Sequence, residues 1–220
     1  MHRTSDRKGF DDLSESLVTV SDPGSSAAEA YRSLRATLLY APLEPEPTLI
    51  TLTSPGPQEG KSTTCANLGV VLAQVGKRVL VVDCDFRRPV QHKIFEVRNH
   101  FGVVDVVTGQ HSVDDVWHEP LPRLHLLTVG SIPPDPTELL SSQRFAKFLW
   151  QLRQKADYVL VDAPPVGMVS DPTMLANQSD YVIMVLDAQR TRKASVRKSI
   201  RRLESVGGTV LGTVMNKIKV

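Results

Sequence analysis

Three short apolar runs each end directly in a polar block, and this pattern limits the folds open to the chain. The runs cover residues 49–53, 79–82 and 159–161, and hydrophobic residues within them do not alternate with charged ones. Continuous runs of this kind are typical of parallel strands that are buried on both faces. Because open α/β sheets bind ligands outside the carboxyl ends of their strands, the polar blocks are the first candidates for a site.

Strand and helix patterns continue to alternate along the rest of the chain. Strands are expected at residues 48–53, 78–83, 124–129, 158–162, 181–186 and 209–216. Helices are expected at residues 61–75, 89–97, 102–108, 136–155 with a break near Ser141, 172–177 and 191–206. This alternation predicts a three-layer α/β fold, in which helices flank a mostly parallel sheet.

The length of 220 residues fits a single domain, which we expect to span residues 25–220. Residues 1–24 are polar and are predicted to form a flexible N-terminal arm. A helix is expected over residues 25–40, because a capping-box pattern starts at Ser26 and apolar residues follow at helical spacing. Three prolines in residues 41–47 end this helix and form a tether to the first strand.

Composition argues against several classes of protein. The net charge of +2 gives no global attraction to nucleic acid, and the scattered histidines lack metal-ligand spacing. Cys65 and Cys84 lie in expected regular elements, which favours a reduced cytoplasmic compartment over a disulfide framework. No signal peptide is recognisable, and the longest apolar run, residues 181–186, is too short to span a membrane. A function at the inner face of a membrane would therefore need a partner that recruits the protein.

The first polar block has the pattern of a phosphate-binding loop between a strand and a helix. Its residues are Gly56, Pro57, Gln58, Glu59, Gly60, Lys61, Ser62 and Thr63. In such loops the backbone amides and the helix N-terminus hold phosphate, the lysine reaches the β- and γ-phosphates, and the hydroxyl binds Mg²⁺. These roles fall to Lys61 and Ser62. The match is imperfect, because Pro55 stands at the first glycine position, so an ordinary strand–turn–helix connection stays open as an alternative.

The other two blocks supply carboxylates. Asp83 and Asp85 lie two residues apart at one strand end, so they share a face in extended chain, and Asp162 ends another strand. Carboxylates placed in this way can support a metal ion or accept a proton. Arg87 is a candidate for neutralising phosphate charge, with pairing to Asp85 as the alternative. Each carboxylate alone also suits a turn or a helix cap, but three such blocks in this order indicate an ATP-type nucleotide with Mg²⁺.

Taken together, the motifs resemble the bacterial tyrosine kinases of capsule and exopolysaccharide synthesis. The segments that carry the resemblance are Val79–Arg87 (apolar-D-x-D-x-R), Val159–Pro165 (apolar-D-x-P-P), Gly130–Leu140 (G-x-x-P-P-N-P-x-E-L-L, with Asp135 for Asn) and Glu29–Arg35 (E-x-x-R-x-x-R). The resemblance implies a P-loop NTPase fold of the deviant Walker type. It also implies tyrosine (auto)phosphorylation from ATP and Mg²⁺ in the regulation of polysaccharide synthesis and export.

The resemblance assigns catalytic roles to individual side chains. It implies that Lys61 and the loop amides hold the phosphates of ATP. It implies that Ser62 coordinates the metal ion and that Asp85 and Asp162 support the ion through water. Asp83 would accept the proton of an attacking tyrosine hydroxyl.

The resemblance also implies contacts outside the phosphate site. Asn216, at the end of the last strand, would contact the base. Glu29, Arg32 and Arg35 would lie at a subunit contact of a ring-like homo-oligomer, and a membrane-embedded polysaccharide copolymerase would be the partner. From the residues alone, a local ion pair between Glu29 and Arg32 is the alternative.

The tyrosines of this chain differ from the family pattern. The family usually carries a tyrosine cluster in a C-terminal tail, and residues 217–220 contain none. We expect Tyr31 on a helix core stripe and Tyr158 and Tyr181 in buried strands, which leaves Tyr40 as the accessible one. The alternative function is therefore an ATP-gated scaffold that controls a copolymerase without tyrosine transfer.

A partition or septum-placement ATPase is a second alternative with the same fold. That family has an extra loop lysine at the position of Gly56, and its absence counts against this alternative. A basic cluster would suit an anionic partner; it comprises Arg190, Arg192, Lys193, Arg197, Lys198, Arg201 and Arg202. The same helix carries an apolar stripe, which makes a solvated basic face the simpler interpretation. The stripe comprises Val196, Ile200, Leu203 and Val206.

Overall fold

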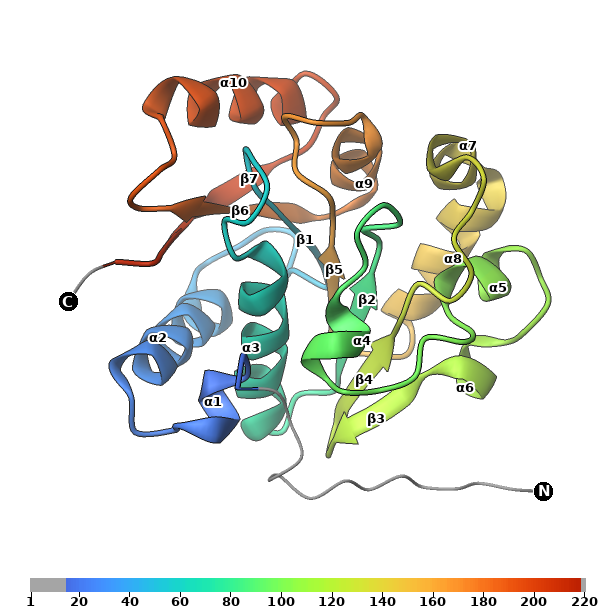
Figure 1. The fold of residues 1–220 in the computed structure, drawn as a ribbon, viewed down its shortest axis with the longest axis horizontal. Helices are drawn as coiled ribbons and strands as arrows, with labels where there is room; N and C mark the ends of the chain where they lie inside the picture. Colours follow the sequence, from blue (N-terminus) through green and yellow to red (C-terminus); the bar gives the residue numbers. More distant parts are fainter. Residues whose placement is uncertain (1–14, 219–220) are drawn as a thin grey trace.

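The computed structural model describes residues 15–218 and shows one seven-stranded sheet with helices on both faces (Figure 1). The strand order is β3-β4-β2-β5-β1-β6-β7. Neighbouring strands are parallel except β3, which is antiparallel to β4. The strands are β1 (Leu49–Thr53), β2 (Val79–Asp83), β3 (His118–Leu121), β4 (Leu124–Leu127), β5 (Tyr158–Asp162), β6 (Tyr181–Asp187) and β7 (Val210–Asn216). The prediction of a three-layer, mostly parallel α/β fold is confirmed.

The helices match the expected ones apart from the shortest. They are α1 (Val18–Ser21), α2 (Ser26–Tyr40), α3 (Lys61–Gln74), α4 (Gln91–Ile94), α5 (Val103–Val107), α6 (Val113–Val116), α7 (Pro136–Ser141), α8 (Gln143–Arg153), α9 (Asp171–Gln178) and α10 (Lys193–Glu204). The break expected near Ser141 lies at Ser142, whose side chain accepts a hydrogen bond from the Phe145 amide and caps α8. The sequence did not reveal α1, α6 or β3, which have four residues each.

Alternate residues of each central strand face different helix layers. In β2, Val79 and Val81 pack in the cluster that contains α3. Leu80 and Val82 face the opposite side and pack in the cluster that contains α8. Since both faces are covered, every residue of the strand is buried and the strand is a continuous apolar run in the sequence.

Part of the expected flexible arm is packed against the domain. Residues 1–14 lie outside the described residues, but Leu17 is fully buried in the core cluster of α3. Both the backbone N–H and the hydroxyl of Thr19 donate to Asn67 Oδ1 of α3, at 3.1 and 2.8 Å. The prediction of a flexible arm is therefore wrong for this stretch. Its anchor is 48 residues away in sequence, so no local pattern could indicate it.

The start of α2 also differs from the prediction. Ser25, and not Ser26, is the N-cap, and its Oγ accepts a hydrogen bond from the Ala28 amide at 3.2 Å. Glu29 is consequently out of register for a capping box and pairs with Arg32 instead, at 2.7 Å. Among the described helices, none is both long and apolar enough to cross a bilayer.

Candidate active site

The sheet brings the three polar blocks together at its carboxyl edge. Asp83 at the end of β2 and Asp162 at the end of β5 are register partners on adjacent strands. Asp162 is also paired with Leu52 of β1, from which the chain enters the loop before α3. The strand order thus places residues about 80 positions apart in sequence side by side.

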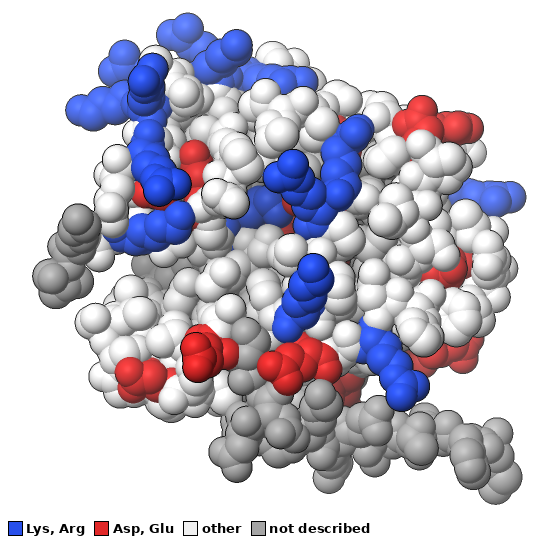
Figure 2. Space-filling model, viewed as in Figure 1, with Lys and Arg blue, Asp and Glu red and all other residues white. Residues whose placement is uncertain are grey.

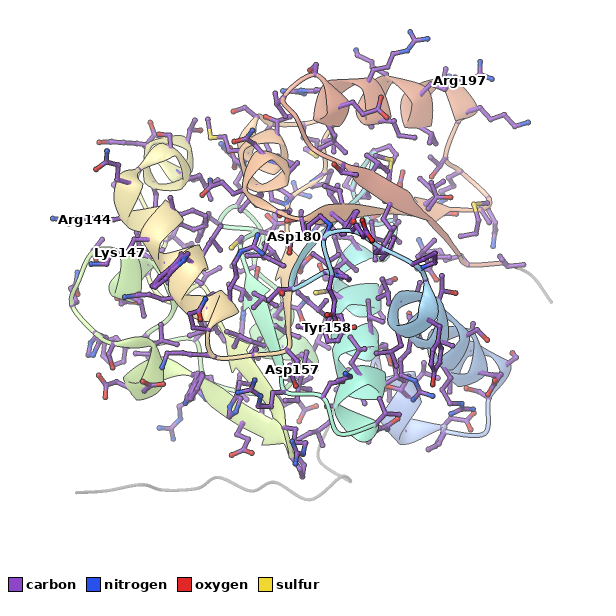
Figure 3. The ribbon with its side chains drawn as sticks, turned by 180° about the vertical axis from the view of Figure 1, so that it is seen from behind. Arg144, Lys147, Asp157, Tyr158, Asp180 and Arg197 are labelled. Carbon is purple, nitrogen blue, oxygen red and sulfur yellow. The ribbon has the colours of Figure 1, made fainter. Side chains whose placement is uncertain are left out.

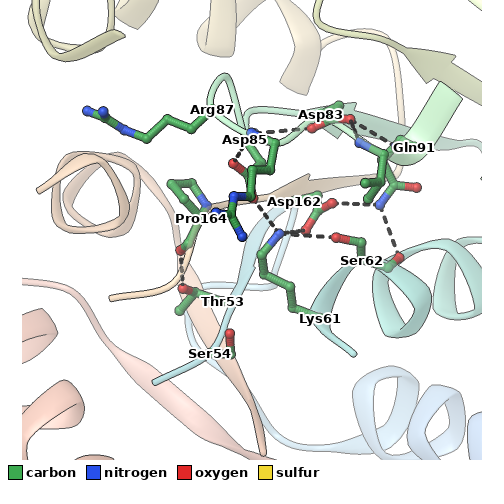
Figure 4. A network of polar contacts seen from close by, with 12 residues as sticks. Thr53, Ser54, Lys61, Ser62, Asp83, Asp85, Arg87, Gln91, Asp162 and Pro164 are labelled. Carbon is green, nitrogen blue, oxygen red and sulfur yellow. Dashed lines mark hydrogen bonds and ion pairs between the residues drawn. The ribbon is translucent and has the colours of Figure 1, made fainter. Parts of the chain in front are cut away.

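A single cation position lies at the centre of the site (Figure 4). Lys61 Nζ is 2.8 Å from Asp85 Oδ2 and 3.1 Å from Asp162 Oδ1, and it donates to Ser62 Oγ at 3.1 Å. All four residues are buried. Burial by itself lowers the pKa of Lys61, but the charges of Asp162 and Asp85 raise it overall. The three residues expected to bind Mg²⁺ therefore converge on one point, where an ammonium group now sits.

The phosphate-binding loop is braced by the end of β7. Gly60 has φ +92°, and a Cβ there would lie 1.8 Å from Asn216 Nδ2, so only glycine fits. Asn216 Nδ2 donates to the Glu59 carbonyl at 3.1 Å, and Lys217 Nζ donates to the Gln58 carbonyl at 2.6 Å. The structure thus places Asn216 against the loop backbone. Its contact with a base stays a prediction.

Proline at the first glycine position is compatible with this loop. The Pro55 carbonyl accepts a hydrogen bond from the Gly167 amide at 3.1 Å, and the Ser54 carbonyl accepts one from Val166 at 2.8 Å. A Cβ at Gly167 would approach the Pro55 oxygen to 2.4 Å. The loop entrance is therefore joined to the segment after β5 through carbonyl groups, and the N–H that proline lacks is not needed.

Asp83 organises the turn after β2. Its Oδ1 accepts the amide of Asp85 at 3.1 Å, and its Oδ2 accepts the amides of Val90 and Gln91 at 3.1 and 3.0 Å. The residue has no exposed surface. Burial, together with the charge of Asp162, raises the pKa of Asp83 to about 8. The carboxyl group thus has a proton affinity suited to proton transfer near neutral pH, but no open face.

Arg87 pairs with a residue that sequence reasoning did not single out. Its Nε is 2.9 Å from Oδ2 of Asp171, a fully buried carboxylate at the start of α9. Thr137 Oγ1 donates to the same carboxyl group at 3.4 Å, so Asp171 joins the segments after β2, β4 and β5. The proposed pairing of Arg87 with Asp85 is wrong, and Figure 4 shows the side chain extending away from Lys61.

Gln91 is the other residue that was missed. It is fully buried at the start of α4, and its Nε2 donates to Asp162 Oδ2 at 2.8 Å and to the Ser62 carbonyl at 3.0 Å. Gln91 therefore orients a carboxylate that faces the cation position. A single glutamine carries no motif, whereas the Asp171–Pro172 pair at an expected helix start was a usable signal for Asp171.

The residues expected at a subunit contact make contacts within their own chain. Arg32 forms an ion pair with Glu29 and donates a hydrogen bond to the Pro23 carbonyl at 3.0 Å. Arg35 donates to the Val71 carbonyl of α3 at 3.1 Å. The local ion pair between Glu29 and Arg32 is thus present, and the subunit contact stays a prediction.

The basic residues of α10 cover one end of the molecule (Figure 2). Leu203 is fully buried beneath the helix, and Val196 and Ile200 pack against the same cluster. Val206 was expected in the apolar stripe, but it is 37 % exposed and lies outside it. Arg202 is the exception among the cations, because it donates to the Val166 carbonyl at 2.8 Å. The outer face of α10 is therefore a solvated basic surface.

Comparisons with known proteins decide the family. Residues 56–213 match the AAA domain family. The chain is 34 % identical over 205 residues to the tyrosine-protein kinase YwqD of Bacillus subtilis. The aligned region covers 93 % of this chain and 86 % of that protein. This chain belongs to the bacterial tyrosine kinases. The kinase domain of the Escherichia coli tyrosine kinase ETK superposes with a TM-score of 0.86 at 29 % identity, covering 100 % of this chain and 85 % of that one.

The septum-site-determining protein MinD of Pyrococcus horikoshii shares the fold alone. Its TM-score is 0.64 at 21 % identity, over 76 % of this chain and 69 % of that one. The comparisons therefore support the enzyme class expected from the motifs, a protein-tyrosine kinase on a P-loop fold.

Proposed function

We propose that this kinase uses ATP and Mg²⁺ and regulates the synthesis and export of a capsular or extracellular polysaccharide. The observation that carries the proposal is the convergence of Ser62, Asp85 and Asp162 on the position of the Lys61 ammonium. Hydroxyl and carboxylate oxygens are the ligands that Mg²⁺ prefers. The same point lies at the N-terminus of α3, where the helix dipole favours phosphate.

The charges of the site give Lys61 two alternative sets of partners. In this structure its ammonium group neutralises Asp85 and Asp162. Ser62, Asp85 and Asp162 would hold the metal ion, which supplies positive charge against the transferred phosphoryl group when bound. Lys61, released from the two carboxylates, would then reach the β- and γ-phosphates of ATP together with the amides of residues 56–63.

Asp83 is the proposed proton acceptor for the tyrosine hydroxyl. With a pKa of about 8 it holds a proton near neutral pH and must lose it before it can act as a base, and both of its oxygens accept backbone amides. The role therefore requires residues 84–90 to move when the acceptor binds. If the turn stays closed, Asp85 is the alternative base, since it is 4 % exposed whereas Asp83 has no exposed surface.

Calorimetry and phosphotransfer on the purified chain test this proposal. We expect ATP to release heat only when Mg²⁺ is present, and a tyrosine-containing peptide to be labelled from ATP. Asp83→Asn should lower kcat more than ATP affinity if Asp83 is the base, whereas Asp85→Asn should weaken the Mg²⁺ dependence of binding. Absence of heat in folded protein would refute the nucleotide site.

We also propose a homo-oligomer that a membrane-embedded copolymerase recruits to the inner membrane face. The support is the E-x-x-R-x-x-R segment on α2, where Glu29 is 66 % exposed. Arg32→Ala combined with Arg35→Ala should lower the mass measured by light scattering and leave ATP binding intact. The matched control is Arg197→Ala with Arg201→Ala, which removes two arginines from α10. An unchanged mass in the α2 variant would remove the interface.

One observation favours the scaffold alternative, in which nucleotide binding gates assembly without tyrosine transfer. Tyr158 and Tyr181 are 4 % and 6 % exposed, so they are poor acceptors within the chain. A nucleotide-dependent change of oligomer size without labelling of tyrosine on the chain, a peptide or a co-expressed partner would select the scaffold.

A further inference from the structure

The four tyrosines of the chain differ sharply in accessibility, and all lie among the described residues. Tyr40 is 85 % exposed, whereas Tyr158 and Tyr181 are buried and Tyr31 is half-buried. Tyr40 is the last residue of α2 and is followed by a segment without helix or strand, residues 41–48. An exposed tyrosine beside a segment without helix or strand is accessible to the active site of a kinase.

The fold places Tyr40 far from the active site of its own chain. Arg35, five residues before it, contacts Val71 near the C-terminal end of α3, while Lys61 starts that helix. The segment that follows lies at the amino edge of the sheet, because the Tyr181 hydroxyl donates to the Pro45 carbonyl and Asp180 binds the amides of Thr48 and Leu49. Figure 3 shows the molecule from behind, with Asp180 and Tyr158 of this edge labelled.

The two edges are too far apart for a reaction within one chain. β1 has five residues and so separates the edges by about 16 Å. A hydroxyl must come within about 3 Å of the group it attacks. A phosphoryl group can therefore reach Tyr40 only from the active site of a second copy.

The chemistry around Tyr40 complements the surface around the active site. Glu44 and Glu46 follow Tyr40 and are exposed, and Pro42, Pro45 and Pro47 keep the segment out of a helix. Arg88 is exposed beside the carboxylates of the site, and Arg87, although it pairs with Asp171, is 44 % exposed. An acidic acceptor segment would thus meet two cations at the carboxyl edge of the partner copy.

We propose that Tyr40 is a phosphoacceptor of this kinase, modified in trans by a second copy of the chain. The proposal rests on the kinase function proposed above. Tyr40 Oη forms a bond to the terminal phosphorus of a bound nucleoside triphosphate, and the bond from that phosphorus to the bridging oxygen breaks. The nucleoside diphosphate leaves with the bridging oxygen, and the hydroxyl proton passes to a carboxylate of the second copy's active site.

A mixing experiment tests the site and the trans geometry together. Lys61→Met chain, labelled with heavy isotopes, is incubated with unlabelled wild-type chain and Mg-ATP, and phosphopeptides are mapped by mass spectrometry. Phosphate on Tyr40 of the heavy chain is the expected result. Phosphate in the heavy chain confined to another tyrosine, or phosphate on Tyr40 of the unlabelled chain alone, would overturn the proposal.

Two further variants separate this proposal from the kinase function itself. Tyr40→Phe should lower self-phosphorylation at least tenfold while a Glu/Tyr copolymer is still labelled at the wild-type rate. Labelling of the copolymer without any label on Tyr40 would overturn the acceptor and leave the kinase intact; labelling of neither would overturn both. Glu44→Gln with Glu46→Gln should slow transfer roughly fivefold, whereas the control pair Glu119→Gln with Glu204→Gln should not. Equal rates of Tyr40 phosphorylation in the two double variants would overturn the proposed pairing of the acidic segment with the arginines.

Discussion

The two edges of the sheet use the same residue type in opposite ways. At the amino edge, Asp180 accepts the amides of Thr48 and Leu49 at 2.9 and 2.8 Å and pairs with Arg153 (Figure 3). Its pKa is lowered overall, because hydrogen bonds from Arg153 and the two amides outweigh the effect of burial. At the carboxyl edge, burial and the charge of Asp162 raise the pKa of Asp83.

The difference shows what each edge is built for. The carboxylates of the amino edge each have an arginine, so their charges are satisfied within the chain and fix the strand ends. At the carboxyl edge, Asp85 and Asp162 share one lysine, which leaves negative charge in a buried place. An arrangement of that kind is poised for a cationic ligand, and its cost to stability is a mark of a functional site.

The largest effect is expected from the lysine shared by the carboxyl edge. Lys61→Met should lower kcat/KM for phosphotransfer by about 100-fold or more, because one cation that stabilises the phosphoryl group is lost. Steady-state kinetics with a tyrosine peptide measure this. Lys147→Met, which removes an exposed lysine on α8, is the control and should retain activity. Full activity of Lys61→Met would contradict the site.

Next comes the amino edge, where stability and not activity should change. Asp180→Asn should lower the free energy of unfolding by about 2 kcal/mol, because Arg153 loses its charge partner and the two amides lose a carboxylate acceptor. Because the folded pKa is lowered, this stabilisation is present above the unfolded value near 4 and is lost as pH falls through the folded pKa. Urea unfolding at pH 7 and pH 3 measures the loss of stability and its pH dependence. A variant with lower kcat and unchanged stability would contradict a purely structural role for the amino edge.

Asp83 should give the opposite pH dependence. Its folded pKa of about 8 means that the folded chain retains a proton that the unfolded chain releases above about pH 4. Its stabilising contribution is therefore complete below pH 4 and is lost as pH rises toward 8. Relative to wild type, Asp83→Asn should become more stable with each step from pH 5 to pH 8. A stability difference that is flat with pH would show that Asp83 is ionised in the folded chain.

The smallest effect is expected from an exposed pair at the amino edge. Arg78 Nη2 lies 2.7 Å from Asp157 Oδ1, but 55 % of the arginine side chain is exposed. Water and salt screen such pairs, so Arg78→Gln should leave the thermal midpoint within about a degree of wild type and activity unchanged. A large drop measured by differential scanning calorimetry would show that the amino edge depends on its exposed charges as well.

The sequence indicated the parts of this molecule that have a local signal. The runs at β1, β2 and β5 predicted buried parallel strands, since burial on both faces leaves no polar positions in a strand. The motifs containing Lys61, Asp83 and Asp162 indicated the right edge of the sheet. Helix α1 lies in a polar N-terminal stretch and strand β3 has the sequence HEPL without an apolar run, so neither had such a signal.

What the sequence determined by itself was the fold class, the family and the residue types of the site, because short-range patterns encode them. The tertiary structure alone decided which charges meet. In the structure Arg87 pairs with Asp171, Gln91 donates to Asp162, and Asn216 donates to the phosphate-binding loop. These partners come from strands and loops far apart in the chain, and strand order, which no local pattern specifies, sets their distances.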